Sequence, residues 1–183
     1  MEMKRVALLV FLLVAGLQLC HAQRFKSTVS HIRFFSDAPL EDVEAINESV
    51  SSIIDATQKT MVIMVPIADF EFKKKLMQEH FNENYLESDK YPSAIFKGKI
   101  LGWDGSDGTF EPVAVGTLEM HGVVQEVEIK GQLTKKEDEV TLSTVFDIRI
   151  EDYKIKVPKA VFYKIAEVVQ VTAKITYSPY EKN

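Results

Sequence analysis

Polar and apolar residues alternate with a period of two along most of the chain after residue 23. This period places successive side chains on opposite faces of an extended strand, so the apolar residues of each run share one face. Glycine, proline, aspartate and asparagine separate the runs and favour turns. The pattern predicts eight strands, mostly joined as hairpins, over residues 25–35, 50–54, 60–67, 93–101, 111–120, 124–133, 140–150 and 166–177.

One segment between these strands has a helical period instead. Met77, Phe81 and Tyr85 are spaced four residues apart. This spacing puts the three side chains on one face of a helix over about residues 70–86. Pro92 ends the segment, because the residue before a proline is pushed toward extended geometry. We therefore predict one amphipathic helix in a chain that is otherwise β.

Three weaker patterns complete the secondary structure. Residues 160–165 predict a short second helix. Residues 40–46 predict one or two helical turns, for which Asp37 would be the cap. The strand over residues 60–67 is apolar on both faces, so we expect both of its sides to be covered.

The alternation also predicts how the strands assemble. It is typical of an antiparallel sheet with one buried face, and a sheet of this size tends to close because closure removes its edges. An eight-stranded barrel is just wide enough to be filled by side chains or to hold one slim ligand. We predict a mainly β single domain over residues 23–183, an antiparallel eight-stranded β-barrel with the helix packed against it. Gly98 and Gly116, which are predicted to face inward, favour an open interior.

The first 22 residues have the three-part grammar of a secretory signal peptide. Two basic residues precede an uncharged run over residues 6–17, and a small-x-small ending follows. The run is too short to span a bilayer core of about 30 Å. We expect cleavage between Ala22 and Gln23, no membrane span afterwards, and a periplasmic or secreted protein. Lipidation of Cys20 is the alternative that the residues leave open.

Cleavage at this point changes the charge and the cysteine count. It removes one acidic and two basic residues, so the formal net charge falls from −5 to −6, and it removes Cys20, the only cysteine. The remaining chain then has no disulfide, which a domain of about 150 residues can do without. Its acidic balance argues against nucleic-acid partners, which basic domains usually bind.

Two groups of polar residues are candidates for chemistry. His80 and Glu83 are three apart, a spacing at which helical side chains can converge on an ion. Zinc sites usually use two or three imidazoles, however, and no protease, hydrolase or phosphate-loop motif occurs. Asp104 and Asp107 lack the spacing of a calcium loop. We expect a solvated helix face and a turn, with no metal, no cofactor and no catalytic residue.

Two motifs resemble the YceI-like family. The run Asp89-Lys-Tyr-Pro-Ser-Ala-Ile-Phe96 is similar to the acidic-Lys-Tyr-Pro-x-Ala-x-Phe pattern that ends the family's helical stretch. The run Gly116-Thr-Leu-Glu-Met-His-Gly-Val123 is similar to its Gly-Thr-Leu hairpin. The resemblance implies an exported, lipocalin-like antiparallel barrel. Several family members bind a polyisoprenoid quinone or a fatty amide along the barrel axis. No catalytic residue is known for the family, so none is carried over.

The resemblance decides between two interpretations of the interior. The residues alone favour a packed core, because aromatic stripes are usually core. The resemblance favours a cavity for a long-chain apolar small molecule: a polyisoprenoid, an isoprenoid quinone, or a fatty acid or amide. We expect the helix to act as a flap over this ligand. The predicted cavity residues are Ile32, Phe34, Phe70, Phe72, Met77, Phe81, Tyr85, Phe96, Ile100, Leu118, Val127, Phe146, Ile148 and Phe162.

Three alternatives stay open at this point. The chain could form a homodimer. It could be a secreted interaction or stress protein with a filled barrel, in which case an exposed Trp103 is the first candidate contact. It could also be a metal-dependent enzyme that uses His80 and Glu83, although the ligand count above argues against this.

Overall fold

The computed structural model describes residues 23–37, 42–156 and 166–180. Its strands are β1 (Arg24–Ser36), β2 (Val43–Asn47), β3 (Ser51–Asp55), β4 (Thr60–Pro66), β5 (Glu71–Phe72), β6 (Ser93–Leu101), β7 (Gly108–Phe110), β8 (Val113–Met120), β9 (Val123–Lys136), β10 (Glu139–Arg149) and β11 (Val168–Pro179). The helical elements are α2 (Lys75–His80), the π-helix η1 (Phe81–Tyr85) and the 3₁₀ turn η2 (Ile150–Tyr153). The short helix predicted over residues 160–165 lies outside the described residues.

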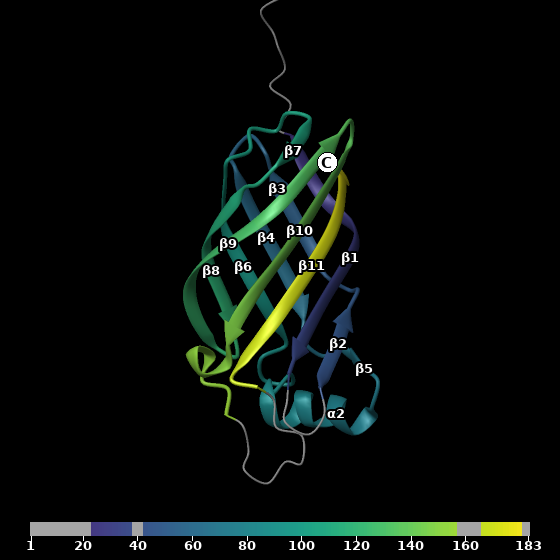
Figure 1. The fold of residues 1–183 in the computed structure, drawn as a ribbon, viewed down its shortest axis with the longest axis vertical. Coiled ribbons are helices and arrows are strands. Elements are labelled where there is room, and N and C mark those ends of the chain that lie inside the picture. Colours follow the sequence, from purple (N-terminus) through teal and green to yellow (C-terminus); the bar gives the residue numbers. More distant parts are fainter. Residues whose placement is uncertain (1–22, 38–41, 157–165, 181–183) are drawn as a thin grey trace, which may run out of the picture.

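Eight of these strands close into an antiparallel barrel, as predicted (Figure 1). The hydrogen-bonded order is β11-β10-β9-β8-β6-β4-β3-β1, and β1 pairs back with β11 to complete the ring. Each ring strand coincides with one predicted run, because the alternation reports directly on which side chains face inward. Ile54, Leu133 and Ile175 are inward positions with no exposed surface. The short strands β2 and β5 extend from β1, and β7 pairs with β9.

The helical turns predicted over residues 40–46 are wrong. The chain here forms β2, which pairs with the end of β1 on one side and with β5 on the other. Val43 and Ala45 are buried, and the Glu44 carboxylate between them accepts a hydrogen bond from the Arg33 guanidinium of β1. Pairing with a distant strand therefore overrides the local acidic pattern that favoured a helix.

The covering predicted for both faces of residues 60–67 is also wrong. Met61 faces inward and is buried, but Val62 and Met64 point out of the barrel and are each 42% exposed. The predicted helix does not cover this strand but lies across the end of the barrel (Figure 1). Ile53, the β3 partner of Val62, is equally exposed, so the outer face of β4 stays apolar and uncovered among the described residues.

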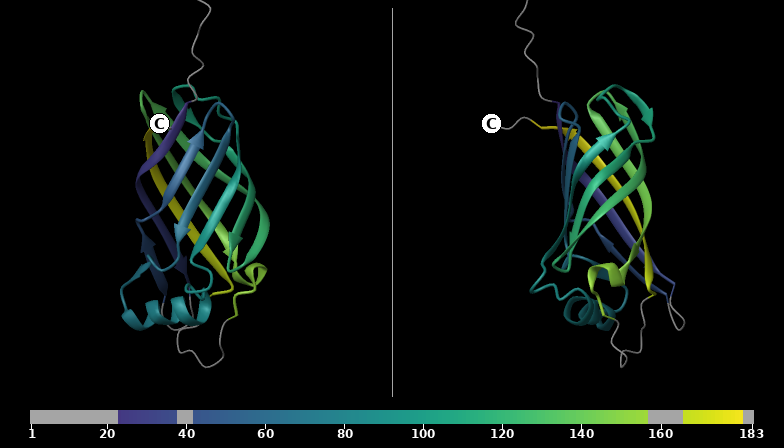
Figure 2. Two further views of the ribbon diagram at one scale, coloured as in Figure 1. Left: turned by 180° about the vertical axis from the view of Figure 1, so that it is seen from behind. Right: turned by 90° about the vertical axis from the view of Figure 1, so that its left-hand side faces the viewer.

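The predicted helix is present as α2 followed directly by η1, and together they lie across one end of the barrel (Figure 2). The amide of Leu86 donates to the carbonyl of Phe81, and this five-residue step is the hydrogen bond of a π turn. Leu76 is 51% exposed and faces away from the core. The buried face consists of the three predicted side chains, Met77, Phe81 and Tyr85. Among the described residues, no helix is long and apolar enough to cross a bilayer.

The end of the barrel opposite α2 is filled by side chains, and Trp103 is one of them. Its ring lies 6.2 Å from that of Phe25, and its indole N–H donates to the Ser106 carbonyl at 3.1 Å. Trp103 is only 4% exposed, so the expectation of an exposed tryptophan contact is wrong. The reason is the Gly- and Asp-rich loop after β6, which folds the indole back onto the end of the ring.

Tyr177 anchors the same end through a buried hydrogen bond. The Ser52 hydroxyl donates to the Val62 carbonyl at 2.9 Å, so the Tyr177 hydroxyl, 3.0 Å away, donates to Ser52 Oγ. Burial raises the pKa of Tyr177 far above its usual range, although the Ser52 hydrogen bond opposes the shift, so the phenol stays neutral. A buried hydroxyl with a partner fixes side-chain positions that purely apolar packing leaves adjustable.

Candidate ligand-binding site

A cavity of about 180 Å³ lies inside the barrel and reaches toward α2. Seven of the eight ring strands contribute to its wall, and β3 alone does not. The turn before β5, η1 and Leu86 close it at the α2 end. Lys130 and Thr144 are the only polar residues of the wall among the described residues. Such a lining offers hydrocarbon contacts and almost no hydrogen bonds, which suits an apolar ligand.

Most of the predicted cavity residues lie on this wall. Nine of the fourteen line it: Ile32, Phe34, Phe70, Phe81, Phe96, Ile100, Leu118, Phe146 and Ile148. Met77 and Tyr85 are buried under the helix, and Phe72 and Val127 pack against the core, but these four do not line the cavity. Phe162 lies outside the described residues. That any of these side chains contacts a ligand stays a prediction.

Several wall residues are absent from the predicted set. Four of them come from β11: Val169, Val171, Ala173 and Ile175. Three more come from β4: Met61, Ile63 and Val65. The alternation of β11 already places its four residues on the inner face, so pattern alone was sufficient to find them. The β4 residues were hidden because that strand is apolar on both faces, and its sequence does not show which face is inside.

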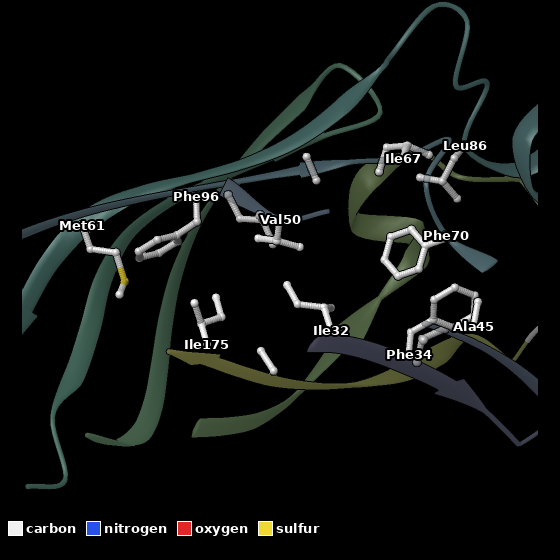
Figure 3. Close-up of a cluster of buried hydrophobic side chains, with 14 of the residues drawn as sticks. Ile32, Phe34, Ala45, Val50, Met61, Ile67, Phe70, Leu86, Phe96 and Ile175 are labelled. Carbon is white, nitrogen blue, oxygen red and sulfur yellow. The ribbon is translucent and has the colours of Figure 1, made fainter. Parts of the chain in front are cut away.

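Four phenylalanine rings close the cavity at the α2 end. Phe34 of β1 lies 5.4 Å from both Phe70 and Phe81, measured between ring centroids, and stacks on Phe81. Phe72 lies 5.0 Å from Phe81. Figure 3 shows Phe34 and Phe70 close together beside Leu86, with Met61, Phe96 and Ile175 farther along the barrel. We call Phe34, Phe70, Phe72 and Phe81 the aromatic floor. Aromatic pairs at such distances add roughly 0.5–1.5 kcal/mol each beyond the area they bury.

Gly98 and Gly116 shape the opposite part of the wall. They are direct partners in the β6–β8 ladder and both face inward. A Cβ on Gly98 would lie 2.6 Å from the Phe96 ring, and one on Gly116 would lie 2.4 Å from the Gly98 Cα. The two glycines therefore let two strands approach closely and let the Phe96 ring lie against the wall. The space that they release is occupied by this ring and by backbone, so the glycines bend the wall and do not enlarge the interior.

The ring is not hydrogen-bonded uniformly between β9 and β10. These strands pair from Lys136 and Glu139 at their hairpin down to Gly131 and Thr144, and no further. Beyond that point residues 123–130 of β9 pair only with β8, and residues 145–149 of β10 pair only with β11. At the α2 end the strands are joined again through η2, where the Gln125 amide donates to the Asp152 carbonyl at 2.7 Å. We call this interval the β9–β10 gap (Figure 1).

The polar residues singled out in the sequence do not gather into a metal site. Among the described residues, no group of three His, Cys, Asp or Glu side chains is placed to hold an ion. His80 is half-buried on α2, whereas Glu83 is exposed on η1. Asp104 accepts hydrogen bonds from the backbone and hydroxyl of Ser106, which lower its pKa, and Asp107 pairs with Lys135. Both aspartates thus serve the loop that carries Trp103.

Comparison with known families gives one match. The sequence model of the YceI-like domain matches residues 22–177. A comparison with curated proteins found no match. The family match covers seven ring strands completely and β11 as far as Tyr177, and it includes both motifs named above.

Comparison with solved structures places the same fold in several bacterial proteins. A polyisoprenoid-binding domain from Saccharophagus degradans, implicated in plant cell wall breakdown, aligns with a TM-score of 0.71 at 12% identity, over 85% of this chain and 98% of that one. BcnA of Burkholderia cenocepacia aligns with a TM-score of 0.67 at 16% identity, over 80% and 95%. A YceI protein of Campylobacter jejuni aligns with a TM-score of 0.62 at 16% identity, over 80% and 90%. At these identities the likeness concerns the fold.

Proposed function

The chain belongs to the family of YceI-like domains, and from this premise we propose that it is a binding protein for a long, slender apolar molecule held inside the barrel. The observation that carries the proposal is the cavity wall, which is apolar except for Lys130 and Thr144. The Saccharophagus degradans neighbour, named as a polyisoprenoid-binding domain, supports the same class of ligand. Lys130 is the one charged residue of this wall among the described residues, so the wall offers mainly hydrocarbon contacts, which suits binding.

The energetics favour a long chain. Burying apolar carbon gains about 0.8 kcal/mol for each CH₂ group. Immobilising a ligand costs roughly 4–15 kcal/mol, so about a dozen methylenes are needed before burial outweighs the middle of that range. The cavity of about 180 Å³ is close in volume to engineered apolar cavities of about 150 Å³ that hold one benzene ring, so a chain of a dozen methylenes has to displace wall side chains to enter completely. This requirement favours a slim ligand, and polyisoprenoids, isoprenoid quinones, and fatty acids or amides are the candidate classes.

We propose further that the protein is exported and carries or sequesters this ligand outside the cytoplasm. The support is the uncharged N-terminal run and the cleavage motif before Gln23. N-terminal sequencing and intact mass of the protein recovered from the cell envelope and the medium test this. A mature N-terminus at Gln23 is the expected result. A diacylated Cys20 would replace it with an anchored protein, and an intact Met1 would contradict export.

Lipid analysis of the protein from its own host tests the binding function. Purified protein is extracted with organic solvent and the extract is examined by mass spectrometry. We expect one dominant long-chain species at close to one equivalent. Two variants provide the comparison. Ala173→Phe adds a ring inside the cavity, and Val29→Phe adds the same ring on the exposed outer face of β1.

The two variants separate binding from carry-over. Only Ala173→Phe should lose the co-purified species, while Val29→Phe should retain it. Equal amounts of lipid in both variants would show that the lipid adheres outside the cavity. A clean extract from the unmodified protein, together with no uptake of a neutral apolar dye such as Nile red, would favour the filled-barrel alternative.

A further inference from the structure

An open hollow of about 700 Å³ lies on the outside of the barrel, at the point where β9 and β10 stop pairing. Its polar side chains among the described residues are Glu111, Lys130, Gln132, Ser143, Thr144, Thr172 and Lys174. Ser143 of β10 lies between its ladder partners, Gln132 of β9 and Lys174 of β11. Three neighbouring strands therefore contribute polar side chains to the hollow. The hollow is therefore a polar surface site above the β9–β10 gap.

The hollow and the interior cavity share part of their walls. Lys130, Gly131, Thr144 and Ala173 line both. Thr144 donates from its hydroxyl to the Lys130 carbonyl at 2.6 Å, and this side-chain bond stands at the last paired rung between the strands. Below it the inward side chains Phe146 and Ile148 are only half-buried. The barrel wall is thus thin here, and a polar surface lies next to an apolar interior.

The hollow and the lower part of the β9–β10 gap carry side chains of opposite charge. Lys130 and Lys174 line the hollow, and neither pairs with an acidic side chain among the described residues. Glu111 is the one acidic residue that lines the hollow among the described residues. Farther down, the strands on either side of the gap carry the exposed carboxylates of Glu128 and Asp147. An anion is therefore attracted to the hollow and repelled from the lower gap.

We infer that this hollow is a subsite for an anionic head group, and that the ligand is a single-chain amphiphile whose tail occupies the cavity. The inference rests on the proposed function and narrows its ligand class to a molecule with a carboxylate or phosphate at one end. The two ammonium groups and the Ser143 hydroxyl provide charge-assisted hydrogen bonds to the head. The tail passes beside Thr144 and runs toward the aromatic floor, along about 20 Å of strand between Thr144 and Ile150.

The test compares two probes that differ only in the head. Hexadecanoate and hexadecanol displace Nile red from the purified protein at pH 8, where the acid is ionised. We expect hexadecanoate to bind about tenfold more tightly than hexadecanol, the difference that one charge-assisted hydrogen bond provides. The double variant Lys130→Gln/Lys174→Gln should lose this preference, so that the two probes bind with affinities within about twofold of each other. Raising the salt concentration should reduce the preference in the unmodified protein.

A matched pair of lysines controls for net charge. Lys97→Gln/Lys99→Gln removes the same two charges from the exposed outer face of β6 and should leave both affinities unchanged. Glu111→Gln removes the acidic residue of the hollow and should raise hexadecanoate affinity alone. Equal affinity for the two probes, or equal losses in the two lysine pairs, would overturn the head-group subsite while leaving lipid binding in place. Displacement by neither probe would overturn both this inference and the proposed function.

Discussion

The two ends of the barrel are built differently. At the end away from α2, Trp103 and Tyr177 fill the ring, and each satisfies its polar atom with a hydrogen bond. At the α2 end, the closure consists of phenylalanine rings, of which Phe72 and Phe81 are on short elements, and an apolar cavity lies directly behind them. β5, which carries Phe72, is attached by only two residue pairs to β2. The chain therefore places its rigid packing and its open space at opposite ends.

This difference teaches where stability and binding are located. Buried polar anchors and completely buried side chains are the features of regions that open only with global unfolding. Short strands with few paired residues open at lower cost, and ligand-binding elements are drawn from such regions. The end with Tyr177 should therefore determine whether the barrel folds, and the aromatic floor should determine what the barrel retains. Mutations at the two ends can separate these roles.

The largest effect is expected from Tyr177→Ala. Removing this fully buried ring leaves a cavity and takes away the hydrogen bond that Ser52 Oγ accepts, so the free energy of unfolding should fall by about 4 kcal/mol. Urea unfolding followed by circular dichroism measures it. Tyr177→Phe removes only the hydroxyl and should cost about 1 kcal/mol. Nile red affinity, measured where both variants are folded, should change little. A loss of affinity in Tyr177→Phe would contradict the separation of the two ends.

Phe81→Ala should have the next largest effect, and it should act on binding as well as on stability. The ring contacts Phe34, Phe70 and Phe72 and forms part of the cavity wall. We expect a loss of about 3 kcal/mol in the free energy of unfolding. This is the low end of the usual range, because the other rings of the aromatic floor can move partly into the space that the Phe81 ring leaves. Retention of the co-purified lipid through dialysis should also fall. Met77→Ala, on the same helix face but off the cavity wall, is the matched control.

Phe81→Ala and Met77→Ala together show whether the helix retains the ligand or only stabilises the fold. Both lose a buried side chain, so both should lower stability, but only Phe81→Ala should speed ligand loss. If Met77→Ala releases the ligand as readily, the helix acts through its position alone. If neither variant changes retention, α2 is not the flap over the cavity, and its burial serves folding only.

A smaller effect concerns acid stability at the packed end. Burial would raise the pKa of Asp55, but the backbone N–H of Gln58 and the Arg24 guanidinium outweigh it and hold the pKa below its usual range. The lowered pKa means that this stability is present above the unfolded pKa of about 3.9 and is lost as the pH falls through the folded value. Asp55→Asn should cost about 1 kcal/mol at pH 7, and this cost should shrink as the pH falls toward 2. Thermal melting at both pH values measures it.

An exposed carboxylate provides the control for this acid effect. Glu48 is largely exposed and pairs only with His31, so Glu48→Gln should leave the melting temperature unchanged at both pH values. An equal difference in melting temperature between Asp55→Asn and the unmodified protein at both pH values would contradict the assignment to the ionised carboxylate.

Most of the ring could be predicted from the sequence because each ring strand has one buried face. The period of two in β9 and β10, for example, states which side chains point inward without any knowledge of the neighbours. The segment over residues 40–46 could not be predicted in this way. Its acidic residues fit a helix start locally, and only the distant Arg33 and the backbone of β1 make the extended form favourable. Pairing of this kind is decided by the fold and is not visible in a short window.

The site was less predictable than the fold. Alternation assigns Leu118 and Ile148 to the interior but does not say whether an inward side chain meets another side chain or empty space. Whether an inward side chain meets empty space depends on where the strands stop pairing. Nothing in the sequence around Gly131 and Thr144 indicates that the β9–β10 ladder ends there. The burial of Trp103 could not be predicted either, because a loop residue is buried by the path of the loop and not by a repeating pattern.

The smallest effect is expected from His80→Ala, and it tests the polar face of α2 against its apolar face. The Nδ1 atom of His80 is buried and has no hydrogen-bond partner among the described residues. A buried polar atom without a partner costs free energy, so its removal offsets the packing that is lost with the ring. We expect a change in the free energy of unfolding of less than about 0.5 kcal/mol and unchanged ligand retention. Urea unfolding and the dialysis assay used for Phe81→Ala measure both. If His80→Ala weakened ligand retention more than Phe81→Ala, the chemistry of the helix would reside in its His/Glu face. The metal-dependent alternative would then return in place of the aromatic floor.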